Sequence, residues 1–181
     1  MTNKIVSILI IGLLSFLLYG VYSKTQKSIK SKRLECQSLT TTFEKIFLET
    51  PVNEAIKTLK NGNYEIISHI EYSKYMKSNL VNILTKNQSD KILEDILEKN
   101  MITKKESLDK KTIIDYYIYE NDKEDSGKKN NEAKSYAGYL VFEFKYENKL
   151  IYKIQTDYMN LDGSDINERM NCVINSFLSI N

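Results

Sequence analysis

The sequence predicts an α+β protein: an N-terminal transmembrane helix, then a small domain of several helices packed on one face of an antiparallel β-meander, with a C-terminal helix. Three observations lead to this prediction. An uncharged apolar run opens the chain, helical periodicity follows it, and strand periodicity marks residues 112–158 before one last helical stretch. We therefore divide the chain into an anchor over residues 1–23, a basic stalk over residues 24–38 and a single domain over residues 39–181.

The anchor is predicted from residues 5–23, which are nineteen residues without a charged side chain. As a helix they would be about 28 Å long, enough to cross the hydrocarbon core of a lipid bilayer. The alternative is a cleaved signal peptide, in which Val21 and Ser23 would precede a cut at Lys24. Because the run is long for a signal peptide, we favour an uncleaved, single-pass anchor.

The charges of the chain are unevenly divided. The first 33 residues carry six basic side chains and no acid, whereas residues 34–181 carry 20 basic and 24 acidic ones, a formal charge of −4. An acidic domain lacks the basic face that a phosphate backbone requires, so we predict no nucleic-acid binding. The basic cluster is typical of a membrane flank, where anionic lipid headgroups would lie near Lys24, Lys27, Lys30, Lys32 and Arg33.

Two arguments about the side of the membrane oppose each other. The positive charges after the apolar run would keep the domain in the cytoplasm by the positive-inside rule. An apolar segment at the start of a chain usually acts as an export signal, and Lys is too abundant throughout this chain to be strong topological information. We favour an extracytoplasmic domain slightly over a cytoplasmic one.

The helices are predicted from apolar residues at helical spacing. The stalk is expected to continue as a helix through the stripe Leu39, Phe43, Ile46 and Phe47. Pro51, with Thr50 as its N-cap, begins a second helix that stops at Asn61-Gly62. Three more helices follow: one over residues 76–84, one capped by Ser89, and a C-terminal one from about Asp165.

Strands are predicted where the period of apolar residues becomes two. Residues 112–119 form one strand, and residues 139–146 and 150–158 form a hairpin that turns at residues 147–149. Residues 64–72 fit a strand or a helix. The hairpin has a polar face and an apolar face, the latter made of Leu140, Phe142, Phe144, Leu150, Tyr152 and Ile154. One wet face and one buried face indicate a sheet covered by helices on one side.

No group of side chains in the sequence points to catalysis, to a cofactor or to a metal. The acidic cluster around Gly163 fails the EF-hand pattern, because Tyr158 and Arg169 would stand where that loop needs carboxylates. We interpret Asp165 as the cap of the last helix. His69, the only histidine, is interpreted as a half-buried structural residue.

Two cysteines lie near opposite ends of the predicted domain, Cys36 and Cys172. In an exported domain they can form one intramolecular disulfide, which would close a loop of about 137 residues and fasten the last helix to the stalk. The alternative is two separate buried thiols. A bridge requires Cα atoms within about 7 Å of each other.

The outline resembles two families without sharing their motifs. An apolar helix, a stalk, an antiparallel sheet and a late Cys resemble type IV pilins, although the Gly-Phe pair and Glu of that family are missing. Helices before a meander, with the run LKNGNYE, resemble small NTF2-like domains. Neither resemblance assigns a role to any residue. The sequence favours a membrane-anchored, non-enzymatic accessory or protein-interaction domain; the alternative is a small-ligand-binding domain with an apolar pocket between the helices and the sheet.

Overall fold

The computed structural model describes residues 32–48, 50–102, 109–127 and 135–180, together with Gly12 and Ser15. The chain divides into two compact units, residues 1–33 and residues 34–181. Apart from Gly12 and Ser15, the predicted span lies outside the described residues, so the anchor stays a prediction. Within the described ranges, no helix has the length and apolarity needed to cross a membrane.

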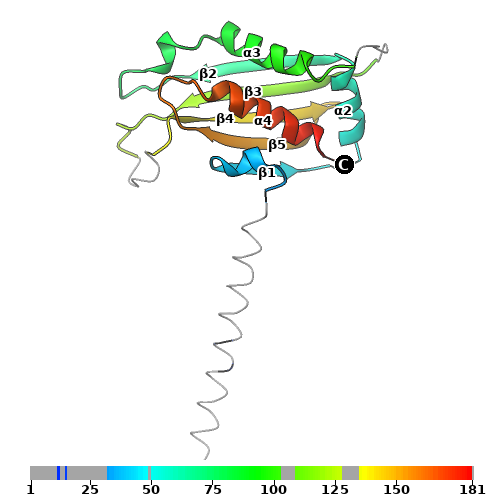
Figure 1. The fold of residues 1–181 in the computed structure, drawn as a ribbon, viewed down its shortest axis with the longest axis horizontal. Coiled ribbons are helices and arrows are strands. Elements are labelled where there is room, and N and C mark those ends of the chain that lie inside the picture. The colour runs from blue at the N-terminus through cyan, green and yellow to red at the C-terminus, as the bar shows by residue number, and fades with distance from the viewer. Residues whose placement is uncertain are drawn as a thin grey trace, which may run out of the picture. The chain divides into compact units, whose positions relative to one another are not determined.

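Residues 34–181 form an α+β domain built on a five-stranded sheet (Figure 1). The strands are β1 (Thr42–Ile46), β2 (Tyr64–Glu71), β3 (Thr112–Glu120), β4 (Gly138–Tyr146) and β5 (Lys149–Tyr158). They lie in the order β1-β5-β4-β3-β2. β2 runs parallel to β3, and all other neighbours are antiparallel. The sheet is therefore mixed, and the prediction of a wholly antiparallel meander is wrong at β2.

The parallel pair follows from the connection between its strands. After β2 the chain passes through α3 (Lys86–Glu98) before it enters β3. A helical crossover of this kind returns the chain to the end of the sheet where β2 began, so β3 runs in the same direction. The sequence pattern predicts the helix and the strand but does not contain the order in which the strands pair.

The helices cover one face of the sheet, as predicted (Figure 1). In the described part of the chain they are α2 (Val52–Lys60), α3 and α4 (Ile166–Leu178), with the short 3-10 helices η1 (Glu35–Ser38) and η2 (Leu80–Asn82). Phe142 and Phe144 of β4 are completely buried, and the ring of Phe144 stacks on Phe177 of α4 at 4.0 Å between centroids. Burial of these aromatic rings supplies a large part of the hydrophobic stabilisation.

An edge strand replaces the helix predicted through Leu39, Phe43, Ile46 and Phe47. Phe43 is 63% exposed, so the apolar stripe is not a buried face. The side chains that turn inward are polar: Gln37 and Thr42 are buried, and the hydroxyl of Thr42 lies 3.0 Å from that of Thr156 on β5. Pairing with β5 therefore overrides the helical spacing of the apolar residues.

Two carboxylates shape the segment between β2 and α3. Glu120 accepts hydrogen bonds from the Ser78 hydroxyl and from the N–H groups of Ser73, Asn79 and Leu80, at 2.5 to 3.0 Å. Asp122 accepts from the N–H groups of Lys74, Tyr75 and Met76, at 2.6 to 3.1 Å. In a helix over residues 76–84 the N–H of Leu80 would donate to the carbonyl of Met76, but it donates to Glu120 instead, so the predicted helix is wrong and only η2 forms.

The ends of two other elements also differ from the prediction. Thr85, not Ser89, caps α3 by accepting a hydrogen bond from the N–H of Gln88 at 3.3 Å. In the β4–β5 hairpin, the register slips between Phe144 and Lys145, so that Ile151 is fully buried where Leu150 was expected. A one-residue bulge of this kind moves the following side chain to the other face.

Candidate interaction face of the sheet

One face of the sheet is turned away from α2, α3 and α4, and we call it the open face. The strand register aligns its side chains in four rows: Phe43, Gln155, Val141, Tyr117 and His69; Lys45, Lys153, Glu143, Asp115 and Ile67; Asp157, Tyr139, Tyr119 and Glu71; and Lys145, Ile113 and Glu65. Most of these side chains are half-buried or exposed. Aromatic, apolar and charged groups therefore share one continuous surface.

Aromatic rings from three neighbouring strands and from the residues before β4 form a tyrosine cluster on the open face. Its members are His69, Tyr117, Tyr119, Tyr136 and Tyr139. His69 stacks on Tyr117 at 5.1 Å, and Tyr119 stacks on Tyr139 at 4.7 Å between ring centroids. Tyr139 also contacts Tyr117 at 6.2 Å and Tyr136 at 6.5 Å. These offset and edge contacts hold the rings in fixed orientations.

Two tyrosines of this cluster, Tyr136 and Tyr139, have raised pKa values and keep their hydroxyl protons. Burial raises the pKa of Tyr139, and Tyr117, Tyr119 and Glu71 raise it further. Burial also raises the pKa of Tyr136, together with the nearby charge of Asp157. Tyr136 and Tyr139 therefore present neutral rings and hydroxyl donors beside acidic side chains.

A ladder of ion pairs crosses the centre of the open face. Lys145 lies 2.6 Å from Asp115 and 3.4 Å from Glu143, and Lys153 lies 2.7 Å from Glu143. The hydrogen bond from Lys153 lowers the pKa of Glu143, and the hydrogen bond to Asp115 raises the pKa of Lys145. These charges satisfy one another, so they fix the surface without leaving an unpaired charge.

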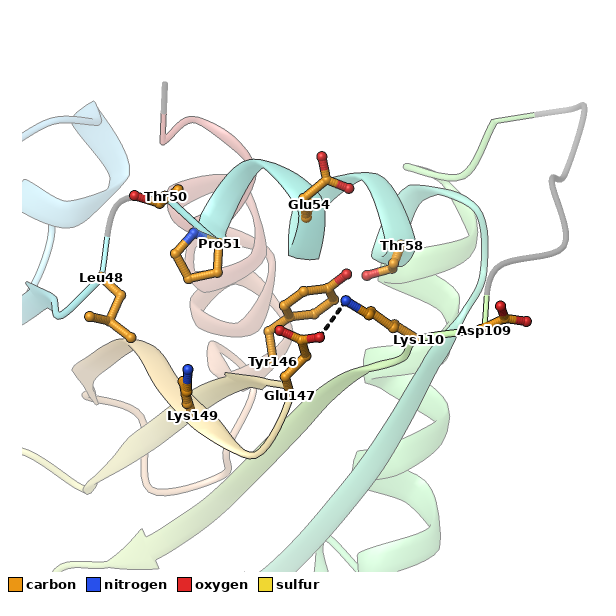
Figure 2. Close-up of a pocket in the computed structure, with 10 residues that line it drawn as sticks. All are labelled: Leu48, Thr50, Pro51, Glu54, Thr58, Asp109, Lys110, Tyr146, Glu147 and Lys149. Carbon is orange, nitrogen blue, oxygen red and sulfur yellow. Dashed lines mark ion pairs between the residues drawn. The ribbon is translucent and has the colours of Figure 1, made fainter.

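A pocket of about 670 Å³ lies between α2 and the β4–β5 turn (Figure 2). Its lining mixes apolar surface with both signs of charge: Leu48, Thr50, Pro51, Glu54, Thr58, Asp109, Lys110, Tyr146, Glu147 and Lys149. Lys110 forms an ion pair with Glu147 across it (Figure 2). The turn beside it is a two-residue one in which Glu147 and Asn148 have φ values of 49° and 61°.

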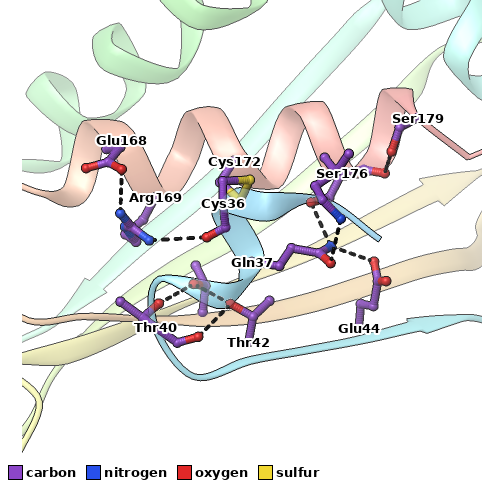
Figure 3. The surroundings of a disulfide bond; sticks show 12 residues. Cys36, Gln37, Thr40, Thr42, Glu44, Glu168, Arg169, Cys172, Ser176 and Ser179 are labelled. Carbon is purple, nitrogen blue, oxygen red and sulfur yellow. Dashed lines mark hydrogen bonds and ion pairs between the residues drawn. A yellow bond between two sulfur atoms is a disulfide. The ribbon is translucent and has the colours of Figure 1, made fainter. Parts of the chain in front are cut away.

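Cys36 of η1 and Cys172 of α4 are joined by a disulfide, which confirms the predicted pair (Figure 3). Their Cα atoms lie 5.8 Å apart, within the range that a bridge requires. Polar contacts reinforce the junction: the buried amide of Gln37 donates to Ser176 at 2.9 Å and to Glu44 at 3.1 Å. Residues 34–38, which were assigned to the stalk, are thus fastened to the domain.

Two other residues singled out in the sequence have different surroundings from those expected. His69 is on the open face with its side chain 53% exposed, and its Nε2 lies 3.4 Å from Glu71. Asp165 stands at the N-cap of α4 but makes no capping bond; its carboxylate accepts from the N–H groups of Met159 and Asn160. Among the described residues, no three His, Cys, Asp or Glu side chains are placed to hold a metal ion.

The tyrosine cluster was not predicted from the sequence. Alternation of side chains along each strand places Tyr117, Tyr119 and Tyr139 on one face, which was a usable signal, but their contacts depend on the pairing of β3 with β4.

No protein-family model matches the chain, and comparisons with curated proteins and with solved structures found no match.

Proposed function

We propose that the chain is a membrane-anchored, non-enzymatic interaction domain that lies on the extracytoplasmic side and binds a protein partner through the tyrosine cluster. The observation that carries the proposal is the cluster itself, five rings held by mutual contacts on a sheet face that no described helix covers. Tyrosine is enriched at protein interfaces because a rigid ring gives a large contact area at little entropic cost.

The charges around the cluster favour a partner segment that carries Arg or Lys. Glu71 lies in the same row as Tyr119 and Tyr139, with Asp157 at the other end. A cationic side chain over a tyrosine ring gains cation–π attraction, and the neighbouring carboxylates add a Coulombic term. The formal charge of −4 over residues 34–181 acts in the same direction over longer distances.

The localisation part of the proposal is supported by two observations. Residues 5–23 have the length and apolarity of a membrane span. The Cys36–Cys172 bridge is of a kind that persists in oxidising compartments outside the cytoplasm.

The experiment is an affinity pull-down of the full chain from solubilised membranes, with the partner identified and then measured against variants. Tyr119→Ala with Tyr139→Ala should abolish recovery of the partner while the thermal unfolding curve remains cooperative. Tyr75→Ala is the matched control, because Tyr75 is 67% exposed and lies away from the sheet. A wild-type protein that repeatedly emerges alone, or a double variant that recovers the partner fully, contradicts the proposal.

A second candidate function is the binding of a small ligand in the pocket beside α2. Leu140, Phe142 and Phe144, beside which an apolar pocket was expected, are fully buried in the core. The mixed charges beside α2 instead favour a small zwitterion. Free amino acids are therefore the probes for a thermal-shift assay; a shift that Lys149→Ala removes and Lys99→Ala preserves would support this function, and the absence of any shift would exclude it for this probe class.

A further inference from the structure

We infer that the domain pairs with a second copy of itself along the outer edge of β2, so that two five-stranded sheets join into one continuous sheet. β2 is the last strand of the sheet on the side of α3 (Figure 1). It contains eight residues, so its open edge is long. The inference does not require the partner proposed for the tyrosine cluster, because its hydrogen bonds come from the backbone at the edge of β2; only the side chains that set its register, Glu65, Ile67 and His69, lie on the open face.

The direction of the β2 backbone groups follows from one hydrogen bond. The N–H of Thr112 donates to the carbonyl of Asn63 at 3.0 Å, so Asn63 directs its carbonyl at β3. Direction alternates along a strand, which turns the backbone groups of Tyr64, Ile66, Ser68 and Ile70 outward. In the described ranges no backbone hydrogen bond reaches those outward groups. An edge of this length with free donors and acceptors is a template for another strand.

Side-chain complementarity favours both the occupant and the register. In a two-fold antiparallel pair with Ile67 opposite Ile67 of the second copy, Glu65 stands opposite His69 of that copy, twice. The residues whose backbone groups point outward then stand opposite each other across the two strands, Ile66 opposite Ser68 and Tyr64 opposite Ile70. These pairs give about eight backbone hydrogen bonds. Shifting the axis to Ser68 would instead place Glu65 opposite Glu71, which brings like charges together.

The helix beside the edge has a matching asymmetry. Asp90 of α3 accepts hydrogen bonds from Ser68 at 2.5 Å and from Tyr116 at 2.8 Å, which hold α3 over β2. The N-terminal half of α3 carries Lys86, Asp90 and Lys91, and its C-terminal half carries Glu94, Asp95 and Glu98. Lys86 pairs with Asp90 and Lys91 with Asp95 within the helix, so the excess negative charge lies in the C-terminal half.

The same two-fold axis, perpendicular to the sheet, would set the two α3 helices side by side and antiparallel. The charges of Glu94 and Glu98 raise the pKa of Tyr64 and that of Lys91 lowers it, so these three charges lie near Tyr64 of the edge strand. The acidic half of each helix therefore faces the half of the other that carries both lysines, and the two acidic halves lie apart, which makes the second copy a complementary occupant.

Cysteine cross-linking of the full chain in detergent tests the register. The two native cysteines are bonded to each other, so an introduced cysteine supplies the only free thiol among the described residues. Ile67→Cys should give a covalent dimer under mild oxidation, because the axis brings residue 67 against its own copy. Glu65→Cys alone and His69→Cys alone should each give no covalent dimer. A mixture of the two variants should cross-link, because the register places residue 65 opposite residue 69 of the second copy.

Sedimentation of the full chain gives the second readout. The wild-type protein should dissociate with dilution, and Ile67→Lys should shift the equilibrium to monomer by at least tenfold, because it places two lysines at the axis. Val81→Lys is the control, since Val81 is 47% exposed and Ile67 is 46% exposed. A wild-type monomer at every concentration overturns the inference. So does an Ile67→Cys protein that cross-links no faster than Lys45→Cys on the opposite edge strand.

Discussion

The disulfide between Cys36 and Cys172 should supply a large share of the stability of the domain. The bridge closes a loop with a sequence separation of 136 residues. In the chain-entropy description, a loop of this length lowers the entropy of the unfolded chain by about 17 cal/mol/K, which is about 5 kcal/mol at 25 °C. Domains of this size are stable by only about 5–15 kcal/mol, so removal of the bridge should bring the domain close to its unfolding threshold.

The measurement is equilibrium urea unfolding of the full chain in a mild detergent. The variant replaces both cysteines by Ala, because Cys172 is buried and a serine hydroxyl there would lack a partner. The unreduced wild-type protein should unfold at a clearly higher urea concentration than the variant, and dithiothreitol should bring the wild-type protein to the variant's midpoint. Coincident midpoints for oxidised protein and variant would refute the reasoning, because the loop would then contribute nothing measurable.

Three further predictions concern the acidic segment, a glycine and the topology. Burial acts to raise the pKa of Glu120 and Asp122, but hydrogen bonds outweigh it and leave both pKa values below their ordinary range. Their contribution to stability is therefore present above about pH 4.5 and is lost as the pH falls through the lowered pKa values; Glu120→Gln should flatten this acid-side loss in unfolding curves measured against pH. Gly138→Ala should lower the free energy of unfolding by roughly 3 kcal/mol or more, because a Cβ there overlaps the Tyr119 carbonyl and the Tyr158 ring, whereas Gly127→Ala on an exposed loop should change it little. A reporter that is active only outside the cytoplasm, fused after Asn181, should be active, and activity of a cytoplasm-only reporter there would contradict the proposed location.

The parts of the fold that were predictable are those in which local pattern and tertiary environment agree. The β4–β5 hairpin alternates apolar and polar side chains, and α4 presents a continuous apolar stripe that ends on Phe177. Each needs only its own residues to indicate which face is buried. The one-sided covering of the sheet follows from these patterns as well.

The parts that were missed depend on distant residues. β1 exposes Phe43 and buries Thr42, so its hydrophobic pattern is the reverse of its burial. The segment over residues 76–84 loses its helix to Glu120 and Asp122, which lie more than forty positions away in the chain. The tyrosine cluster requires the pairing of β2, β3 and β4, which alternation within one strand does not specify. Cys36 and Cys172 were the exception, since two cysteines allow a single intramolecular pairing.

The bridge also has a mechanical consequence. A pull on the chain through the residues before Leu34 reaches Cys36 first, and there the covalent link transfers the load to Cys172. The segment between the two cysteines, which are 136 positions apart, is excluded from the load, which removes roughly 450 Å of possible extension. β1, an edge strand paired only with β5, would otherwise be the first element to peel from the sheet. Under tension the intact domain therefore yields only at its two tails, the residues before Cys36 and those after Cys172.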